Sequence, residues 1–250
     1  MTVAAMDAPV VRVEAVDLVI RPGRLGFAPE DADRIAARWA ETLAAKPEVW
    51  NGPFFLFERA GFETRAGAAV FAGEGAQTDF ASYMDWRAVD PPDPRFRHVF
   101  PVGAILTADR RLVVGRMSPH TANGGRLYPP SGSFDPHDLV AGPDGRVRLD
   151  PLANILREIA EEIGFDASGW PRAPGWLVVD SGPHRHAVVT LIEAPMTAAA
   201  IEAAAMPHMA ADPERELDRL VFPAFGERLD PAASALYVNR LLDHLADRYP

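Results

Sequence analysis

Cysteine is absent from this chain of 250 residues. Its absence excludes disulfide bonds, thiolate catalysis and zinc or iron–sulfur centres held by cysteine. Long hydrophobic runs are also lacking: charged side chains interrupt the apolar residues at positions 1–20, and no run reaches the length of a membrane span. We therefore expect a cytoplasmic protein that does not bind a membrane.

The chain has fewer basic than acidic residues. Lys and Arg together number 25 against 35 Asp and Glu, which leaves a formal net charge of −10. No cluster of basic residues is dense enough for the basic face of a duplex-binding protein, so we do not expect a nucleic-acid partner. An acidic protein can still bind a small anion if divalent cations and a few well-placed arginines supply local positive charge.

The pattern along the chain predicts two parts. Hydrophobic residues make up 48% of the sequence, enough for one large domain or for a main domain with a substantial extension. In the first part we predict a strand at 10–20, an amphipathic helix at 30–45 and a hairpin at 54–73. The proline-rich tract at 90–97 resists regular structure and is the best candidate boundary. We therefore divide the chain into an N-terminal α+β extension, 1–97, and a main domain, 98–250.

Strands and helices alternate in the main domain. We predict a hairpin at 99–118, a helix at 151–163, strands within 176–193, and helices at 197–205 and 231–247, the last being a C-terminal helix. Helices inserted between strands indicate the α/β class, with a mixed sheet between helical layers.

The helix at 151–163 has well-marked ends. Asp150 is a good N-cap, Pro151 suits the first helical position, and Gly164 suits the left-handed residue after the last turn. Apolar residues cover one face, and Glu158, Glu161 and Glu162 gather on the adjoining face. A lone acidic triplet of this kind is usually a solvated helix face. Carboxylates so spaced repel one another unless a cation lies among them, and hard oxygen ligands suit Mg²⁺ or Mn²⁺.

The surrounding sequence favours the metal interpretation. Residues 157–165 read Arg-Glu-Ile-Ala-Glu-Glu-Ile-Gly-Phe, which fits the end of the Nudix box, REuxEExGu, at every specified position. Residues 128–136 read Tyr-Pro-Pro-Ser-Gly-Ser-Phe-Asp-Pro and are similar to the loop that opens the box. From about 98 to 225 the chain thus resembles the Nudix hydrolase superfamily. The resemblance implies a Nudix-type α/β/α sandwich.

Two features depart from the box. The position of its first glutamate falls on Leu149, with Asp150 one place later, and an extra stretch at 137–146 separates the loop from the helix. The missing glutamate usually supports the box arginine or a metal-bound water. Asp150 either replaces this glutamate or only caps the helix. The Gly-Pro-Asp-Gly turn in the extra stretch predicts that residues 137–146 form an excursion at the rim of the site.

The resemblance also implies roles for individual residues. Glu161 and Glu162 would bind the metal, Glu158 would be a ligand or the base, and the Ser131 carbonyl would complete the coordination. Arg157 would orient these carboxylates. The implied reaction is Mg²⁺-assisted hydrolysis of a diphosphate bond.

Other roles fall outside the box. For the general base we favour Glu216, with Glu193 as its competitor, and either could be an ordinary surface carboxylate. For phosphate contacts we consider Arg116 and the run His184-Arg185-His186, in which the two histidines could instead be ordinary turn residues.

The N-terminal part carries a second, weaker resemblance. Trp39, Pro47, the run at 50–53 and the run at 78–83 are similar to the extension of the UDP-glucose/UDP-galactose hydrolase branch. That branch also has its box acid one place late, as with Asp150. An N-terminal module that only buries its own aromatic residues explains the same pattern.

These observations leave several functions open. The leading hypothesis is a diphosphatase acting on a nucleoside diphosphate derivative, with a nucleotide sugar first and ADP-ribose or CoA as alternatives. A Nudix-fold sensor that binds a nucleotide without efficient catalysis is the alternative from another class, and Leu149 is the feature in its favour. The expected partner is the small-molecule substrate, with a homodimer possible.

Overall fold

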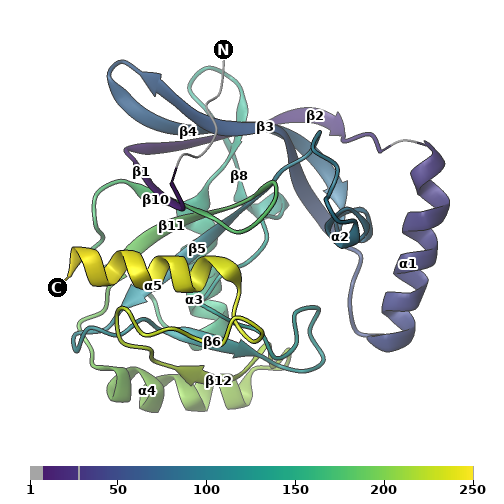
Figure 1. Ribbon diagram of the computed structural model, residues 1–250. Helices are drawn as coiled ribbons and strands as arrows, with labels where there is room; N and C mark the ends of the chain where they lie inside the picture. Colours follow the sequence, from purple (N-terminus) through teal and green to yellow (C-terminus); the bar gives the residue numbers. More distant parts are fainter. Residues whose placement is uncertain (1–7, 28, 250) are drawn as a thin grey trace.

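The computed structural model describes residues 8–27 and 29–249, which form a mixed α/β protein (Figure 1). Its elements in chain order are β1 (Val10–Val13), β2 (Ala15–Arg24), η1 (Pro29–Asp31), α1 (Ala32–Ala45), β3 (Pro53–Arg65), β4 (Ala68–Asp79), α2 (Phe80–Ala88), β5 (His98–Leu106), β6 (Val114–Met117), β7 (Leu127–Tyr128), η2 (Pro136–Asp138), β8 (Leu139–Ala141), β9 (Val147–Leu149), α3 (Pro151–Ile163), β10 (Trp176–Asp180), β11 (Arg185–Glu193), α4 (Ala198–Ala211), β12 (Leu217–Val221) and α5 (Leu236–Arg248). Within this part of the chain, no helix is both long and apolar enough to cross a membrane.

A mixed sheet with the order β1-β10-β11-β5 lies at the centre. β5 is buried along its whole length and runs parallel to β11, while the other pairs are antiparallel. Side chains alternate across a strand, so Val102 and Ala104 pack against α5, whereas Ile105 packs against α3 and α4. Helices thus cover both faces of this sheet, as the predicted α/β/α layering requires.

Strands from both sides of residue 97 share two sheets. In the five-stranded sheet β3-β4-β2-β9-β8, the N-terminal β2 pairs with β9, and Leu18 lies opposite Leu149. In the central sheet, the N-terminal β1 pairs with β10. The tract predicted as a boundary therefore does not separate two independent sheets, because the extension is hydrogen-bonded into the main body.

Three sequence predictions need local correction. The strand expected at 10–20 is broken at Glu14 into β1 and β2, and the helix expected from 231 begins at Leu236. The hairpin expected at 99–118 closes only through the Leu106–Leu112 bridge, after which β6 joins another sheet, β12-β6-β7. β5 instead uses its edge to pair with β11, a partner more than 80 residues later in the chain.

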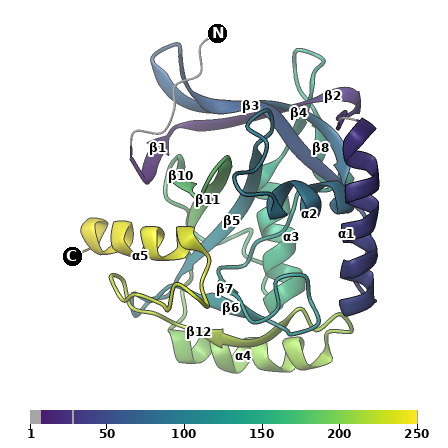
Figure 2. The same cartoon turned by 45° about the vertical axis from the view of Figure 1, so that its right-hand side comes forward.

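The helix α1 is attached mainly through charges. It has no fully buried residue, and its predicted apolar face is only partly covered, with Leu43 36% exposed. Arg34 and Arg38 both donate to Asp85 of α2, whose side chain is completely buried. Figure 2 shows α1 along one side of the molecule, next to α2. Within the extension, α1 therefore forms an outer wall that ion pairs hold to α2.

Candidate active site

The predicted limits of α3 are confirmed. Asp150 accepts hydrogen bonds from the backbone N–H groups of Leu152 (3.0 Å) and Ala153 (3.1 Å), and Gly164 adopts a φ of +79° after the last turn. These contacts identify Asp150 as the helix cap, the second of the two roles considered for it. Leu149, at the position of the box glutamate, is 3% exposed and belongs to the core beside Leu18.

Two of the three helix glutamates are buried. Glu158 is 9% exposed and Glu162 is 4% exposed, whereas 59% of the Glu161 side chain is accessible. Burial raises the pKa of Glu158 to about 8, against an opposing effect of Arg157. Burial also raises the pKa of Glu162 well above its usual range, and the charge of Glu158 raises it further. The cluster therefore holds more negative charge than its surroundings neutralise.

Glu216 belongs to the same cluster. It lies just before β12, where its carbonyl accepts a 2.8 Å hydrogen bond from the Ser118 N–H. Burial raises its pKa, and its charge in turn raises the pKa values of Glu158 and Glu162. The competing candidate, Glu193, is exposed at the end of β11. Glu216, and not Glu193, is thus close enough for its charge to act on Glu158 and Glu162.

Arg157 connects α3 to the segment before it. Its Nη1 donates to Glu158 (2.9 Å) and to Glu161 (3.1 Å), while Nη2 lies 3.2 Å from oxygens of both Asp135 and Asp138. Burial alone would lower the pKa of Arg157, but the charges of these carboxylates outweigh it and raise the pKa. Arg157 thereby links Glu158 and Glu161 of α3 to Asp135 and Asp138.

Asp138 was not identified from the sequence as a site residue. Its side chain is 2% exposed and accepts hydrogen bonds from the Asn154 amide (2.8 Å), the Asp135 N–H (2.9 Å) and Arg157. The stretch at 137–146 was predicted as an excursion at the rim. Its first residues, in η2, instead supply the carboxylate that supports Arg157, and the remainder forms the β8–β9 edge of the five-stranded sheet.

The loop at 131–133 passes directly over the cluster. A Cβ atom placed on Gly132 would overlap Oε1 of Glu158, so the carboxylate of Glu158 would have to move to admit a side chain there. The backbone N–H of Ser131 partly offsets the raised pKa of Glu162. The predicted loop residues are therefore in contact with the buried carboxylates.

The same loop borders the main cavity of the described structure, which has a volume of about 550 Å³. Aromatic and basic side chains from both the extension and the main body line it; the lining comprises Lys46, Phe80, Tyr83, Arg87, His98, Phe100, Ala122, Asn123, Gly124, Arg126, Tyr128, Ser131, Gly132, Ser133, Ser181, Arg185, Ala235, Leu236 and Tyr237. Four of these residues are cations and none is Asp or Glu, so the cavity suits an anion.

The cavity cations differ from most arginines of the protein. Within the described residues, Lys46, Arg87, Arg126 and Arg185 form no ion pair, whereas most of the other arginines do. Arg126, for example, donates only to the carbonyls of Ala232 and Ser234. Unpaired cations facing one cavity in an acidic protein indicate a ligand that supplies the opposite charge.

The two predicted phosphate contacts lie in different places. Arg185 lines the cavity, and its Nε is a buried donor without a partner among the described residues. Tyr237 beside it has a hydroxyl that makes no hydrogen bond of normal geometry, although the Ser131 side chain is close. Arg116 lies outside the lining and forms two 2.6 Å contacts with Asp218. His184 and His186 are also outside the lining.

The donor chemistry of the cluster suits a divalent cation. Carboxylate and carbonyl oxygens are the ligands that Mg²⁺ and Mn²⁺ prefer, and the uncompensated charge of Glu158, Glu162 and Glu216 is what a cation would relieve. As the side chains stand, no three His, Asp or Glu residues of the described chain are grouped closely enough to hold an ion. The guanidinium of Arg157, which donates to Glu158, lies on one side of the cluster.

Comparison with known proteins gives a resemblance in fold. No family model and no curated protein matches the chain. Solved structures that resemble it include a MutT protein from Methanosarcina mazei Go1 (13% identity, TM-score 0.38, covering 61% of this chain and 94% of that one). Another is a NUDIX hydrolase from Nitrosomonas europaea (15% identity, TM-score 0.35, covering 61% of this chain and 89% of that one). A third is a mutT/nudix family protein from Listeria innocua (15% identity, TM-score 0.38, covering 60% of this chain and 92% of that one). Each of these alignments covers about 60% of this chain at a TM-score below 0.4, and the chemistry of the site rests on its own geometry.

Proposed function

We propose that this protein is a Nudix hydrolase that cleaves the diphosphate bond of a nucleoside diphosphate derivative, with a nucleotide sugar as substrate. One observation carries the proposal: a cavity of about 550 Å³, lined by four unpaired cations, borders Gly132, against which the carboxylate of Glu158 lies. An anion in that cavity would have its phosphates beside the acidic cluster.

Glu158, Glu161, Glu162 and the carbonyl of Ser131 would hold Mg²⁺ or Mn²⁺. The bound cation would neutralise the diphosphate and activate the attacking water. Arg157, fixed by Asp138, keeps Glu158 and Glu161 oriented. Because Gly132 has no side chain, the loop can approach the cluster closely and bring the substrate phosphates near it.

Glu216 is the proposed general base. It accepts a proton from the attacking water, whose oxygen forms a bond to one phosphorus while the bond from that phosphorus to the bridging oxygen breaks. The bridging oxygen leaves with the other phosphate. A nucleotide sugar would thereby give a nucleoside monophosphate and a sugar 1-phosphate.

The rest of the cavity supports a nucleotide. Its volume is within the usual range for small-molecule sites, roughly 300–1,000 Å³. Phe80 and Tyr128 offer rings for stacking against a base, and Arg185 offers a donor to a phosphate. Arg116 is engaged by Asp218, so Arg185 is the better of the two candidates for a substrate contact.

Glu162→Gln tests the metal site. The change keeps the shape of the side chain but removes one anionic ligand, so Mg²⁺-dependent turnover is expected to fall by a factor of about 10²–10⁴ with the fold retained. Glu202→Gln, at an exposed position on α4, is the matched control and should keep wild-type turnover. Wild-type turnover in Glu162→Gln at saturating substrate would contradict the assignment.

A panel of substrates tests the proposed substrate class. UDP-glucose, UDP-galactose, ADP-ribose, CoA and dGTP are compared at matched concentration with Mg²⁺ or Mn²⁺, and products are identified by mass. We expect a sugar nucleotide to have the highest kcat/KM. A tenfold preference for CoA or dGTP would exclude the nucleotide-sugar proposal and leave the diphosphatase proposal standing.

The sensor function has one observation in its favour, because the carboxylates do not converge on a metal position as they stand. Mg²⁺-dependent binding of a nucleotide without turnover of any compound in the panel would support this alternative. The buried, mutually repelling carboxylates favour the enzyme, since a protein that only binds gains no stability from holding them together.

A further inference from the structure

The chain contains a single lysine, Lys46, and it lines the cavity. It lies directly after α1, where its ammonium donates to the carbonyl of Thr121. All other basic side chains are arginines apart from the histidines. The one ammonium of the protein is thus placed at the ligand cavity without a carboxylate partner among the described residues.

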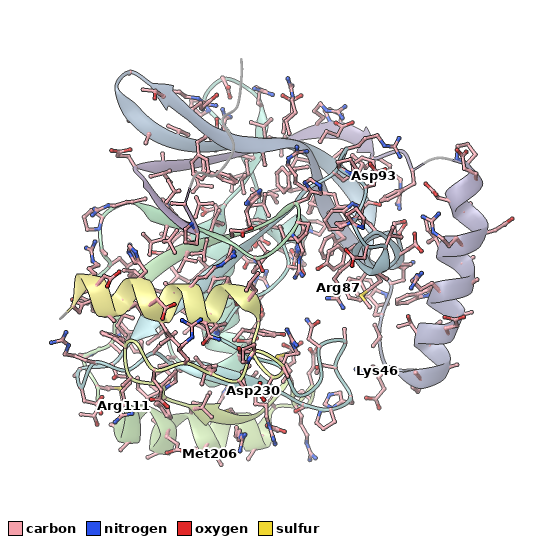
Figure 3. The ribbon with its side chains drawn as sticks, viewed as in Figure 1. Lys46, Arg87, Asp93, Arg111, Met206 and Asp230 are labelled. Carbon is pink, nitrogen blue, oxygen red and sulfur yellow. The ribbon has the colours of Figure 1, made fainter. Side chains whose placement is uncertain are left out.

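Arg87 of α2 is the second cation on this wall. Its Nη1 donates to the amide oxygen of Asn123 (3.0 Å), and its guanidinium lies 5.5 Å from the centre of the Tyr83 ring. Both partners are neutral, so the charge of Arg87 is not compensated by them. Figure 3 labels Lys46 and Arg87, both on the side of α1 that faces the rest of the molecule.

The cavity therefore has two basic walls. Arg126 and Arg185 belong to the main body, where Arg185 lies beside Tyr237, close to Glu162. Lys46 and Arg87 belong to the extension. His98 also lines the cavity; burial lowers its pKa well below the usual range, and the charges of Arg185 and Arg87 lower it further.

A diphosphate at the acidic cluster would be neutralised by divalent cations and by the main-body wall. Two unpaired cations would then remain on the extension wall, in a cavity whose lining includes no Asp or Glu. Leaving such charges partly enclosed and unpaired costs free energy, which a second anionic group on the ligand would remove.

We propose that Lys46 and Arg87 form a binding site for a second anionic group of the ligand, a carboxylate or a phosphate separate from the diphosphate that is cleaved. The inference rests on the proposed function for the position of the diphosphate. It narrows the substrate class to nucleoside diphosphate derivatives that carry an additional acidic group.

Matched ligand pairs separate the two sources of that group. UDP-glucuronate and UDP-glucose differ by a carboxylate, whereas CoA and dephospho-CoA, or NADPH and NADH, differ by a phosphate. We expect the charged member of at least one pair to have a kcat/KM at least tenfold higher than its partner. Equal kcat/KM values within every pair would overturn the proposal, although the diphosphatase would stand.

Variants assign the preference to the two residues. In Lys46→Gln and in Arg87→Gln, the ratio of kcat/KM within the preferred pair should fall at least fivefold. Arg172→Gln is the matched control, because Arg172 also donates only to a carbonyl, that of Ser168, and lies outside the cavity. An unchanged ratio in both cavity variants would overturn the proposal, and a melting temperature close to wild type separates loss of binding from loss of fold.

The single lysine also permits a test that does not depend on turnover. The wild-type protein is treated with an acetylating reagent in the presence of Mg²⁺, and acetylation of Lys46 is followed by mass spectrometry against an added one-lysine peptide. In at least one of the three pairs, the charged member should slow acetylation at least fivefold, and its partner less than twofold. Equal protection by both members of every pair would overturn the site; selective protection without hydrolysis would keep the site and reject the proposed enzyme.

Discussion

Arg157 joins two parts of the site that are separate in the sequence. It contacts Glu158 and Glu161 on its own helix, at positions that a local motif predicts. It also contacts Asp135, at the end of the box loop, and Asp138 in η2, which no motif marked. The helix residues were predictable because spacing on a helix follows from its pitch. Asp138 was not, because its contacts depend on how η2 packs against α3.

Asp138→Asn tests this support at the residue scale. The change keeps the size of the side chain but removes the charge that holds Arg157, so kcat should fall by about 10–100-fold, as is typical for residues that orient metal ligands. The concentration of Mg²⁺ needed for half-maximal rate should rise, whereas KM for the nucleotide changes little. Asp144→Asn, which breaks an acid–arginine pair on the β8–β9 turn, is the control. Wild-type kinetics in Asp138→Asn would reject the positioning role.

Asp150 has a different role, which mutation can separate from catalysis. Asp150→Ala should lower the free energy of unfolding by about 1 kcal/mol, because two backbone N–H groups at the start of α3 lose their acceptor. Asp150→Asn should cap nearly as well and keep wild-type turnover. Urea denaturation and steady-state kinetics measure the two effects. A large loss of turnover in a fully stable Asp150→Asn protein would show that Asp150 replaces the box glutamate after all.

At the scale of elements, the strands β5 and β11 place histidines in the interior. His98 begins β5 and is 6% exposed; His186 in β11 lies edge-on to Phe71. Burial lowers the pKa of His186 to about 4, with Asp180 opposing the shift and Arg97 and His184 adding to it. Sequence analysis could describe His186 only as a candidate turn residue, because its burial depends on the strand pairing.

The stability of the protein should therefore depend on pH through His186. The unfolded chain takes up a proton near pH 6.5 and the folded protein only near pH 4, so stability is fully present above 6.5 and is lost as the pH falls through this interval. Between pH 7 and pH 4, the free energy of unfolding of the wild type should fall by about 3 kcal/mol more than that of His186→Leu. Each unit of pKa shift corresponds to roughly 1.4 kcal/mol. Urea denaturation at pH 7 and pH 4 gives the difference, with His120→Gln, exposed on the surface, as control. A difference that does not change with pH would contradict the assignment.

The helices show where local sequence is sufficient. α3 has a cap, a first-turn proline and a terminal glycine, and its limits match the prediction. α5 has no side-chain cap, and its start was predicted five residues early. The α1 helix was predicted at nearly its observed position, but its ion pairs to Asp85 were not, because they join α1 and α2 across about 50 residues.

The shared sheets make the whole molecule one unit. Leu18 of β2 is 1% exposed, and a Cβ on Gly73 would lie 2.9 Å from its Cδ2, so the side chain fills space that glycine leaves open. It also lies opposite Leu149 of β9. The extension and the main body were treated as separate parts in the sequence because pairing between distant strands leaves no local pattern.

Leu18→Ala tests whether the extension and the main body unfold together. It should lower the free energy of unfolding by about 2–5 kcal/mol, as is usual for a leucine removed from a core. If the sheets couple both parts, thermal unfolding remains a single transition shifted as a whole. Leu43→Ala, at a position 36% exposed on α1, should cost much less. Two separate transitions, with only the first shifted, would show instead that residues 98–250 fold alone.

The pairing of β2 with β9 has a consequence for synthesis on the ribosome. Residues 15–24 leave the ribosome long before residues 147–149, which complete the hydrogen bonds along one edge of β2. During that interval β2, β3 and β4 can assemble but present an unpaired strand edge, which other chains can extend. A strand made near the start of the chain thus keeps one open edge until residues 147–149 have left the ribosome, and newly made chains can aggregate through that edge during the interval.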